Sequence, residues 1–534
     1  MRAVSIITVF AVSIICMPDS GYATTVDHHE FEAWLEAPFH AGAGGTRTLT
    51  LHFSTPDARP GGTLRWRLDL LAPGGRVLRT WRRTQPQEAP ERDVAIRWRA
   101  APALRHGIYR LRLRARAGGG PAVEQDWSVA VGALPAAPAA SLRAADPAEA
   151  WPYTVYLGNL HSQTNHSDGG GALAHCTGAQ APQSAAPGPA DAYAYARQHG
   201  LDFLMTSEHN HMYDGSDGTN READPAAATA LYRSGLQAAA EWNRDHPGLL
   251  AIYGQEWGVI SHGGHLNILN SGELLGWERN ARGELLADTE TPRNDYAALY
   301  RLMRERGWVG QFNHPQGDQF AIGGKPLAWN ADGDQAMLLC EVMNSNAFSV
   351  RTDEAEPRLS TYEAACNQLL EAGYHLAFSS AQDNHCANWG ASYSNRTGVL
   401  VERGTALDVD SLLAALRARR VFATMDKNSR LILTANGHMM GERFVNHGKL
   451  TLRASYLSQG GRRAAAVTVF HGVPGRNGAV AAVGGKARTV LTPAAGEHFY
   501  YARVTQDDGK MLWSAPIWVS QQPRNRALRN VELR

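Results

Sequence analysis

The sequence lacks an excess of charge of either sign. Its 534 residues include 52 Lys and Arg and 51 Asp and Glu, for a formal net charge of +1 at pH 7. A protein that binds nucleic acid by neutralising many phosphates carries a strong basic excess. The composition therefore gives no indication of a nucleic-acid partner. The length favours two to four domains over one.

Long apolar runs are absent after residue 17. Residues 1–23 consist of Met1-Arg2, an apolar run at 3–17, and Gly21-Tyr22-Ala23, an arrangement typical of a secretory signal peptide. This run is shorter than the roughly 20 residues that span a bilayer. We expect an exported protein, periplasmic or extracellular, with no transmembrane segment. The alternative is a lipoprotein anchored through Cys16, which the bulky Ile14 and Ile15 disfavour.

Cysteine is scarce, and none of the five residues stands in a CxxC spacing. That spacing is typical of thiolate metal sites, so one or two structural disulfides are favoured instead. Four cysteines follow the signal peptide: Cys176, Cys340, Cys366 and Cys386. The spacing does not determine how they pair. We expect first a bridge between Cys176 and Cys386, because both lie beside segments suspected to form the functional site.

Apolar and polar residues alternate near both ends of the chain. Residues 64–70 and 109–114 show this period of two, which predicts half-buried antiparallel strands. We therefore predict an N-terminal β-sandwich-like domain at 24–133, followed by a Pro- and Ala-rich linker at 134–152. Alternation returns at 450–454 and 513–519, and predicts a C-terminal β domain at 427–534.

Between residues 153 and 426, short apolar segments alternate with helical segments. Strands are predicted at 155–160, 201–207, 249–254, 308–313, 337–343, 376–380 and 397–401. Helices are predicted at 190–199, 295–306, 359–372 and 410–419. This alternation is typical of β/α units with parallel strands. We predict an α/β domain in which seven strands form a barrel-like sheet.

Histidines and carboxylates follow the ends of these predicted strands, where barrel enzymes build their active sites. Seven such residues stand out, namely His161, Asp168, His209, Glu256, His314, Asp383 and His385, and an eighth, His265, opens a further apolar stretch at 266–269. Imidazoles combined with carboxylates, without thiolates, suit zinc, manganese or iron. Two or three such ions held close together would activate water and stabilise the attacking and leaving oxygens of a hydrolysis. The sequence therefore predicts a metal-dependent hydrolase.

Five segments, in this order, resemble the motifs of PHP-domain metallohydrolases. They are Asn-Leu-His through Ser-Asp-Gly at 159–169, Thr-Ser-Glu-His-Asn at 206–210, Gly-His-Leu-Asn at 264–267, Asn-His-Pro at 313–315 and Asp-Asn-His at 383–385. The resemblance covers residues 153–426, about half of the chain. Residues 396–399 and 416–424 further resemble the exported branch of this family, which contains carbaryl hydrolase.

The resemblance implies a distorted seven-stranded β/α barrel of PHP type that binds up to three metal ions at the carboxyl ends of its strands. It assigns His161, Glu256 and Asp383 to one ion, Glu256, His265 and His314 to a second, and Asp168, His209 and His385 to a third. A hydroxide between the first two ions would be the nucleophile. Glu256, Asp383 and His385 would be the catalytic residues.

The sequence departs from the family where Gln163 replaces the second His of the usual His-x-His motif. An amide oxygen is a poorer ligand than an imidazole, so either the first ion is held weakly or His166 replaces the missing ligand. The alternative for His166 is an exposed turn residue. Arg396 is a candidate for binding a substrate anion, with a surface ion pair as the alternative. His211 is a candidate for contact with the substrate.

The expected function is hydrolysis of a small-molecule phosphoester by a metal-bound hydroxide, with two or three zinc, manganese or iron ions as cofactors. One alternative is a carboxylic ester, amide or carbamate hydrolase of the same fold. Another is a non-catalytic, metal-containing binding protein, in which Gln163 marks the loss of catalysis. The sequence predicts neither the natural substrate nor the oligomeric state.

Overall fold

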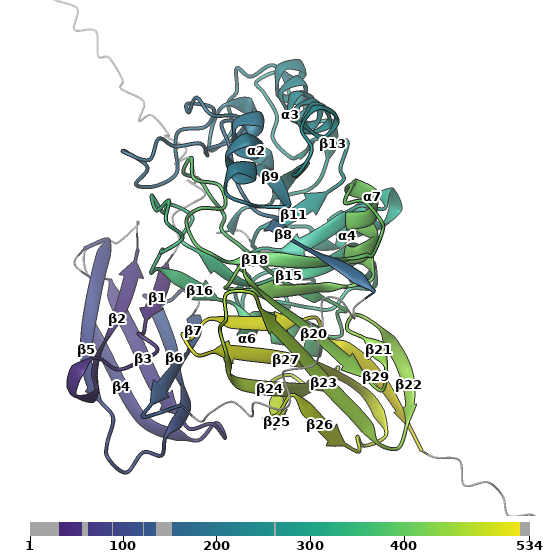
Figure 1. Ribbon diagram of the computed structural model, residues 1–534. Helices are drawn as coiled ribbons and strands as arrows, with labels where there is room; N and C mark the ends of the chain where they lie inside the picture. Colours follow the sequence, from purple (N-terminus) through teal and green to yellow (C-terminus); the bar gives the residue numbers. More distant parts are fainter. Residues whose placement is uncertain are drawn as a thin grey trace, which may run out of the picture.

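The computed structural model describes residues 31–55, 62–87, 89–120, 122–134, 152–260 and 263–523. The predicted signal peptide lies outside these residues, as does the linker except at its ends. Strands account for 42% of the described residues and helices for 16%. Figure 1 shows the N-terminal strands on one side, the C-terminal strands beside them, and most helices above.

Strands β1 to β7 form two antiparallel sheets at the N-terminal end. One sheet contains β1 (Glu32–Glu36), β2 (Thr46–Ser54) and β5 (Glu91–Arg99), and a short 3-10 helix, η1 (Ala43–Gly45), precedes β2. The other contains, in spatial order, β4 (Val77–Pro86), β3 (Thr63–Leu71), β6 (Gly107–Ala117) and β7 (Val123–Val131). The alternation in the sequence turns Leu64, Leu68 and Leu111 into the core between the sheets and leaves Arg65 and Arg67 exposed.

One large sheet runs through the central part of the described chain. Its first part contains, in spatial order, β16 (Leu359–Thr361), β15 (Met337–Ser345), β14 (Val309–Phe312), β11 (Leu266–Leu269), β10 (Leu250–Trp257), β9 (Phe203–His209), β8 (Tyr153–Asn159), β18 (Arg396–Glu402) and β19 (Val421–Thr424). Strand β17 (Ala377–Ala381) pairs with β15 beside this path. Strands β8, β9 and β10 are parallel, so their carboxyl ends meet at one edge.

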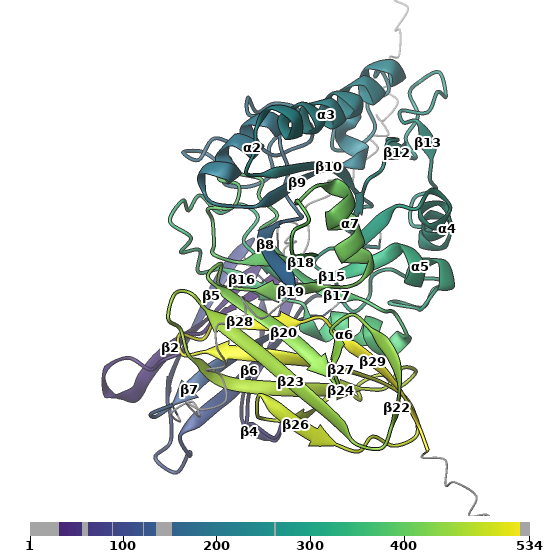
Figure 2. The ribbon, with the colours of Figure 1, turned by 45° about the vertical axis from the view of Figure 1, so that its right-hand side comes forward.

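The same sheet continues into the C-terminal strands through the pairing of β19 with β28 (Met511–Ser514). Beyond β28 follow β27 (Gly496–Gln506), β24 (Ala464–Gly472) and β25 (Ala481–Gly484), while β29 (Ile517–Gln522) pairs with β27 and β22 (Arg443–His447). A separate sheet of β21 (His438–Met439), β20 (Ser429–Ala435), β23 (Leu450–Ser458) and β26 (Arg488–Leu491) contacts it through β20. Figure 2 shows these two layers together.

The helices of the described chain belong mainly to the central region. They are α2 (Pro189–Gln198), α3 (Pro225–Asp245), α4 (Tyr296–Arg306), α5 (Ala331–Ala336), α6 (Glu363–Ala372) and α7 (Val409–Arg417), with a 3-10 helix η2 (Asn210–Asp214) and a small pair of strands, β12 (Leu275–Gly276) and β13 (Thr289–Glu290). Within the described ranges, none is both long enough and apolar enough to cross a bilayer.

The predicted fold class, a distorted seven-stranded β/α barrel, is wrong. All seven predicted strands form, but they belong to an open, mixed sheet in a protein with far more strand than helix. Strand β11 runs antiparallel to both of its neighbours, and β18 runs antiparallel to β8 and β19. No backbone ladder between described residues joins β17 to β18, where a barrel would close. Instead, the Thr397 hydroxyl of β18 donates to the Ser380 carbonyl and accepts from the Ser380 N–H, each at 3.0 Å.

One predicted helix also begins too early. Residues 359–361, placed at its start, form the short strand β16, which pairs antiparallel with the end of β15. Helix α6 begins only at Glu363. The reason lies in tertiary pairing, which the local apolar pattern does not record.

Two disulfides join segments that are distant in sequence. The expected bridge between Cys176 and Cys386 is confirmed, and a second bridge joins Cys340 of β15 to Cys366 of α6. The first closes a loop with a sequence separation of 210 residues. It ties together two loops that carry predicted site residues.

The N-terminal sheets pack firmly against the rest of the protein. One hydrophobic cluster includes Leu51 and Trp98 from these sheets, Trp257 and Phe312 from the central sheet, and Phe470 from the C-terminal strands. Figure 1 shows β1 beside β16, and the two strands are in contact. One hydrophobic cluster therefore extends through all three regions.

A partly buried ion pair near this contact predicts an acid-dependent loss of stability. Burial raises the pKa of Asp126. Two hydrogen bonds from Arg112, each 2.9 Å, and the charge of Arg110 lower it by a larger amount, so the net pKa is below its usual value. A carboxyl with a lowered folded-state pKa stabilises the protein above its unfolded-state pKa of about 3.9, and this contribution is lost as the pH falls through the folded-state value.

We therefore predict that Asp126→Asn lowers the free energy of unfolding by about 2 kcal/mol at neutral pH. The difference from the unaltered protein should be constant above about pH 5 and should narrow as the pH falls from about 5 through the folded-state pKa. Denaturant titrations at several pH values measure it. The exposed control Asp245→Asn should show little difference at any pH. A difference for Asp126→Asn that is independent of pH would contradict the assignment.

Candidate metal centre

The eight predicted ligands meet in one cluster, although they come from six segments of the chain. His161 and Asp168 follow β8, His209 ends β9, and Glu256 lies in β10 one residue before its end. His265 precedes β11, His314 follows β14, and Asp383 and His385 follow β17. Seven of these residues are buried, and the side chain of His314 is 12% exposed. The carboxyl ends of the parallel strands thus position the cluster.

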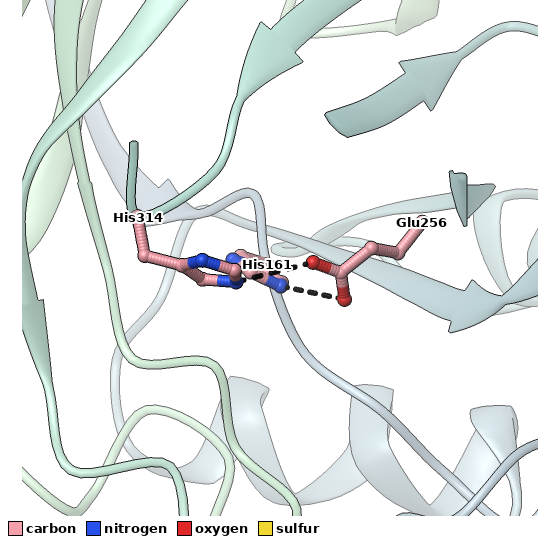
Figure 3. Close-up of side chains that lie close together, drawn as sticks. All are labelled: His161, Glu256 and His314. Carbon is pink, nitrogen blue, oxygen red and sulfur yellow. Dashed lines mark hydrogen bonds and ion pairs between the residues drawn. The ribbon is translucent and has the colours of Figure 1, made fainter. Parts of the chain in front are cut away.

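Glu256 lies at the centre of this cluster. Its Oε2 is 2.9 Å from His161 Nε2 and 3.6 Å from His209 Nδ1. Its Oε1 is 3.0 Å from His265 Nδ1 and 3.4 Å from His314 Nε2. Figure 3 shows His161 and His314 stacked on the same side of the carboxylate, with both rings directed towards it. One carboxylate therefore touches four imidazoles.

Three sets of side chains bring ligand atoms within 4.8 Å of one another. They are His161, Glu256 and His314; His209, Glu256 and His265; and Asp168, His209 and His385. The third set is the one that the family resemblance assigns to an ion. The first two sets differ from that assignment. The resemblance grouped His314 with Glu256 and His265, whereas His314 lies with His161 and Glu256, and His209 takes its place beside His265. Sets of imidazole and carboxylate ligands with such proximity could hold divalent ions.

Asp383 lies between two of these sets. Its Oδ1 is 3.0 Å from His161 Nε2 and 3.8 Å from His385 Nδ1, and its Oδ2 is 3.9 Å from His314 Nε2. The carboxylate can therefore share in more than one ion site.

The backbone at two ligands lies in the left-handed region, which residues other than Gly rarely adopt. The φ angle is 28° at His314 and 53° at Asp383. The N–H of His314 donates to Glu341 Oε2 at 2.7 Å, and the N–H of Asp383 donates to the His161 carbonyl at 3.0 Å. Strained backbone of this kind persists where its surroundings hold it, and it concentrates at functional sites. These contacts aim both side chains at the cluster.

A second layer of polar groups holds the ligands in place. Glu341 Oε1 contacts His161 Nδ1 at 3.2 Å, and Asn313 Nδ2 donates to Glu256 Oε1 at 2.7 Å. Partners of this kind orient imidazole ligands and increase their basicity. The sequence analysis did not assign a role to Glu341. Its signal is a carboxylate in the middle of the apolar segment 337–343.

Opposite charges dominate the electrostatics of the cluster. Burial raises the pKa of Glu256. The charges of His161, His265 and His209 lower it by a larger amount, so the net pKa lies well below the usual range. Burial lowers the pKa of His161, yet the charges of Asp383, Glu256 and Glu341 raise it well above its usual value. Buried carboxylates so close together need positive charge beside them. Divalent cations would supply that charge to the same ligand atoms.

Gln163 lies in the cluster but presents its nitrogen to it. Its Nε2 donates to Glu256 Oε2 at 2.6 Å and to the Ser207 carbonyl at 3.3 Å. Its Oε1 is buried and has no hydrogen-bond partner among the described residues. An unsatisfied buried oxygen on a side chain that contacts Glu256 fits a nearby cation. The residues present therefore fit divalent metal ions.

The loop that carries His161 and Asp168 is anchored by Glu208. This carboxylate accepts hydrogen bonds from Thr164 N at 2.9 Å, Thr164 Oγ1 at 2.7 Å and Ser167 Oγ at 2.7 Å. Burial raises the pKa of Glu208 to about 7, against the effect of these hydrogen bonds. The Cβ of any larger residue at Gly169 would lie 2.3 Å from the Gln163 carbonyl carbon, so the tight loop requires glycine there.

The same loop is tied to the loop that carries His385. Gly171 N donates to the His385 carbonyl, and Ala387 N donates to the Gly171 carbonyl, each at 2.9 Å. The disulfide between Cys176 and Cys386 joins these segments covalently. The position of Asp168 relative to His385 is therefore held by both kinds of bond.

Three further candidates lie outside the three ligand sets. His166 Nδ1 contacts the Tyr253 hydroxyl at 2.6 Å, and burial lowers the pKa of His166 to about 4. His211 is buried, with its Nε2 3.6 Å from Asp217 Oδ1. Arg396 is 1% exposed, and its guanidinium donates to three backbone carbonyls and to Glu354, an arrangement that holds its own loop. None of the three is among the residues that line the cavity described next.

A cavity of about 410 Å³ opens onto the cluster. Five of the eight ligands line it: His209, His265, His314, Asp383 and His385. Amide side chains such as Gln316, Gln319 and Asn344 and aromatic side chains such as Phe348 and Tyr362 form much of the remaining wall. Among the described residues that line the cavity there is no Lys or Arg.

Comparisons with known proteins add little. No family model matches the chain, and no curated protein matches it. Solved structures that are similar include a β-glucuronidase from Bacteroides uniformis, with 11% identity, a TM-score of 0.18 and coverage of 92% of this chain and 61% of that chain. A β-glucuronidase from Parabacteroides merdae has 10% identity, a TM-score of 0.16 and coverage of 92% and 64%.

A third similar structure is a CARDB domain from Pyrococcus furiosus in complex with di-metal ions. It has 14% identity and a TM-score of 0.15, and it covers 19% of this chain and 88% of that domain. This chain spans less than two thirds of either β-glucuronidase. At TM-scores this low, the likeness supports no conclusion about fold or function.

Metal binding should stabilise the fold through Glu256. We predict that a chelator lowers the melting temperature and that added zinc or manganese restores it, with each ion contributing on the order of 3 kcal/mol at a hundredfold excess over its Kd. Glu256→Gln should lose this response, because a neutral amide cannot balance a cation.

Glu371→Gln is the matched control for this measurement. Glu371 is also buried, but it accepts hydrogen bonds from the backbone N–H groups of residues 478–480 and belongs to none of the ligand sets. This control should lose stability yet keep the metal response in differential scanning fluorimetry. A full metal response in Glu256→Gln would show that the ions bind elsewhere.

Replacing the amide of Gln163 should increase the affinity of the cluster for zinc. We expect Gln163→His to tighten zinc binding about tenfold, equivalent to roughly 1.4 kcal/mol, because an imidazole supplies a ligand where the amide supplies a donor. Gln180→His, in the same loop but outside the ligand sets, should leave the affinity unchanged. Isothermal titration calorimetry compares the three proteins, and unchanged or weaker binding by Gln163→His would contradict this interpretation.

Proposed function

We propose that this protein is a metal-dependent hydrolase that uses two or three divalent ions, zinc, manganese or iron, to cleave a small-molecule ester. The observation that carries the proposal is three ligand sets, two joined through Glu256 and two through His209, each with at least one member that lines a cavity. The ordered motifs that resemble PHP-domain metallohydrolases support it. Several ions held by a shared carboxylate are suited to hydrolysis.

The bound ions would supply Lewis acidity, lower the pKa of a water molecule and stabilise negative charge on the reacting oxygens. The protein's own residues supply position. Glu256 lies beneath the reacting centre and holds the imidazoles, while Asn313 and Gln163 orient its two oxygens. These groups are buried, so they present the same geometry to each substrate molecule.

Asp383 and His385 are the residues suited to contact the substrate, because both line the cavity. His385 Nδ1 lies 2.9 Å from the carbonyl of Asp383, which can only accept a hydrogen bond. With the proton on Nδ1, the lone pair of Nε2 would be available to a cation held together with Asp168, whose Oδ1 is 3.6 Å away. Asp383, between two ligand sets, is placed to accept a proton from water at the floor of the cavity.

A phosphoester is our leading substrate class, because several ions balance the charge that develops on phosphoryl oxygens. One observation favours a second candidate, a carboxylic ester, amide or carbamate. The described cavity wall contains no Lys or Arg, so any negative charge of the substrate would have to be balanced by the ions alone. A substrate that carries little charge fits such a wall.

Export is part of the same proposal. Disulfides persist in oxidising compartments such as the periplasm and the extracellular space. The two disulfides support an exported enzyme, as does the apolar N-terminal segment of the sequence.

A panel of chromogenic substrates tests the proposed reaction. We predict that protein loaded with zinc or manganese hydrolyses 4-nitrophenyl phosphate or bis(4-nitrophenyl) phosphate, and that Asp383→Asn lowers kcat by about a hundredfold or more. Chelated protein should be inactive. Turnover of 4-nitrophenyl acetate or an aryl carbamate alone would replace the phosphoester by the second candidate. No turnover by metal-loaded protein would favour a non-catalytic metal-binding protein.

A further inference from the structure

One wall of the cavity comes from the N-terminal sheets and not from the region that carries the metal ligands. Phe31, Glu32 and Trp34, in or beside β1, line the cavity, as do Val123 and Gln125 of β7. The ligands that line the same cavity all lie at or beyond His209, in the central region of the chain. The cavity is therefore incomplete without the N-terminal sheets.

The alternation within β1 presents Trp34 to the cavity. Ala33 and Leu35 point into the hydrophobic core and are 2% and 3% exposed. Glu32 and Trp34 alternate with them and lie on the opposite face of the strand. Strand β1 is the end strand of its sheet, and it contacts β16 of the central region as well as β7.

The contact between the two regions is held by specific bonds. Thr361 N of β16 donates to Gln125 Oε1 at 2.6 Å, and Asp126 N of β7 donates to Thr361 Oγ1 at 3.2 Å. The guanidinium carbon of Arg358 lies 6.0 Å from the Trp34 ring centroid. Gln125 is 1% exposed, so its amide is fixed in the contact. The wall that carries Trp34 is thus fixed relative to the metal ligands.

The cavity wall beside the metal ligands also carries aromatic side chains. The Phe348 ring lies 4.9 Å from the ring of His385, and the Tyr362 ring lies 6.4 Å from that of His314. Aromatic side chains therefore stand both next to the ligands and on the N-terminal wall. Apart from Asp383, Glu32 and Asp318 are the carboxylates of the described lining, which contains histidines but no Lys or Arg. Such a wall repels anionic groups and binds apolar rings.

We propose that the N-terminal β-sheets form part of the substrate-binding site, where Trp34 binds an aromatic substituent of the substrate that carries no negative charge. This inference rests on the proposed function, because it takes the metal cluster as the reacting centre. It assigns the N-terminal region a role in specificity rather than in stability alone. Trp34 is a binding residue in this account, and it takes no part in the bond cleavage.

Binding of two phosphonates that differ in one group tests the proposal. Phenylphosphonate and methylphosphonate carry the same metal-binding group, and they differ in the presence of a ring. Titration calorimetry on the zinc-loaded full-length protein should give tighter binding of phenylphosphonate. Trp34→Ala should weaken phenylphosphonate binding about fivefold to tenfold and leave methylphosphonate binding unchanged.

Two further variants separate this role from a general effect on the fold. Trp34→Phe should retain most of the preference for the ring, because it keeps an aromatic side chain. Trp329→Ala is the matched control, since Trp329 is 49% exposed and does not line the cavity. It should bind both phosphonates like the unaltered protein. With aryl and methyl esters of the same acid, Trp34→Ala should raise KM for the aryl ester and leave kcat nearly unchanged.

The outcomes distinguish this proposal from the proposed function. Equal effects of Trp34→Ala on both phosphonates, or no effect on either, would overturn the role of Trp34 and leave the metal-dependent hydrolase intact. If the unaltered zinc-loaded protein bound neither phosphonate and cleaved no ester, the proposed function would fail, and the role of Trp34 with it.

Discussion

The burial of several carboxylates around Glu256 is the constraint on which the rest of the site depends. Removing an ionised carboxylate from water is expensive unless opposite charge and hydrogen bonds compensate. Glu256 is fully buried and touches four imidazoles, Asn313 and Gln163. The surrounding loops bring these partners together. The left-handed backbone at His314 and Asp383 and the disulfide beside His385 follow from that requirement.

An open sheet can position such a cluster as well as a closed barrel, because only the carboxyl ends of neighbouring strands need to meet. Strands β8, β9 and β10 provide three of these ends, and β14 and β17 add the others through β15. The open path also lets the sheet continue through β19 and β28 into the C-terminal strands. At the other end, β16 meets β1, which brings the N-terminal sheets to the mouth of the cavity.

The local pattern of the sequence predicted the positions of strands better than their arrangement. The seven apolar segments of the central region form strands, and residues that follow several of them form the ligand cluster. Both features could be predicted because each is marked within a short stretch of sequence. The direction of β11 and the missing ladder between β17 and β18 depend on pairing between distant residues, which apolar periodicity does not record. The barrel prediction was wrong for this reason.

The same limit applies to the site. The ligands could be recognised because His and carboxylate residues recur at strand ends in a known order. Glu341 and Trp34 were not predicted. A carboxylate inside an apolar segment marks Glu341 without defining its role, and Trp34 lies in a different region of the chain. Arg396 looked accessible from sequence but is buried among carbonyl groups. Each of these residues acquires its role only through tertiary packing.

The central claim is that Glu256 binds more than one ion at the same time. Anomalous diffraction from crystals of the zinc- or manganese-loaded protein measures this directly. The account predicts at least two peaks, each within roughly 2.0–2.2 Å of a Glu256 oxygen or a cluster imidazole nitrogen. Peaks absent from the cluster in metal-replete crystals, or a single ion that does not contact Glu256, would contradict it.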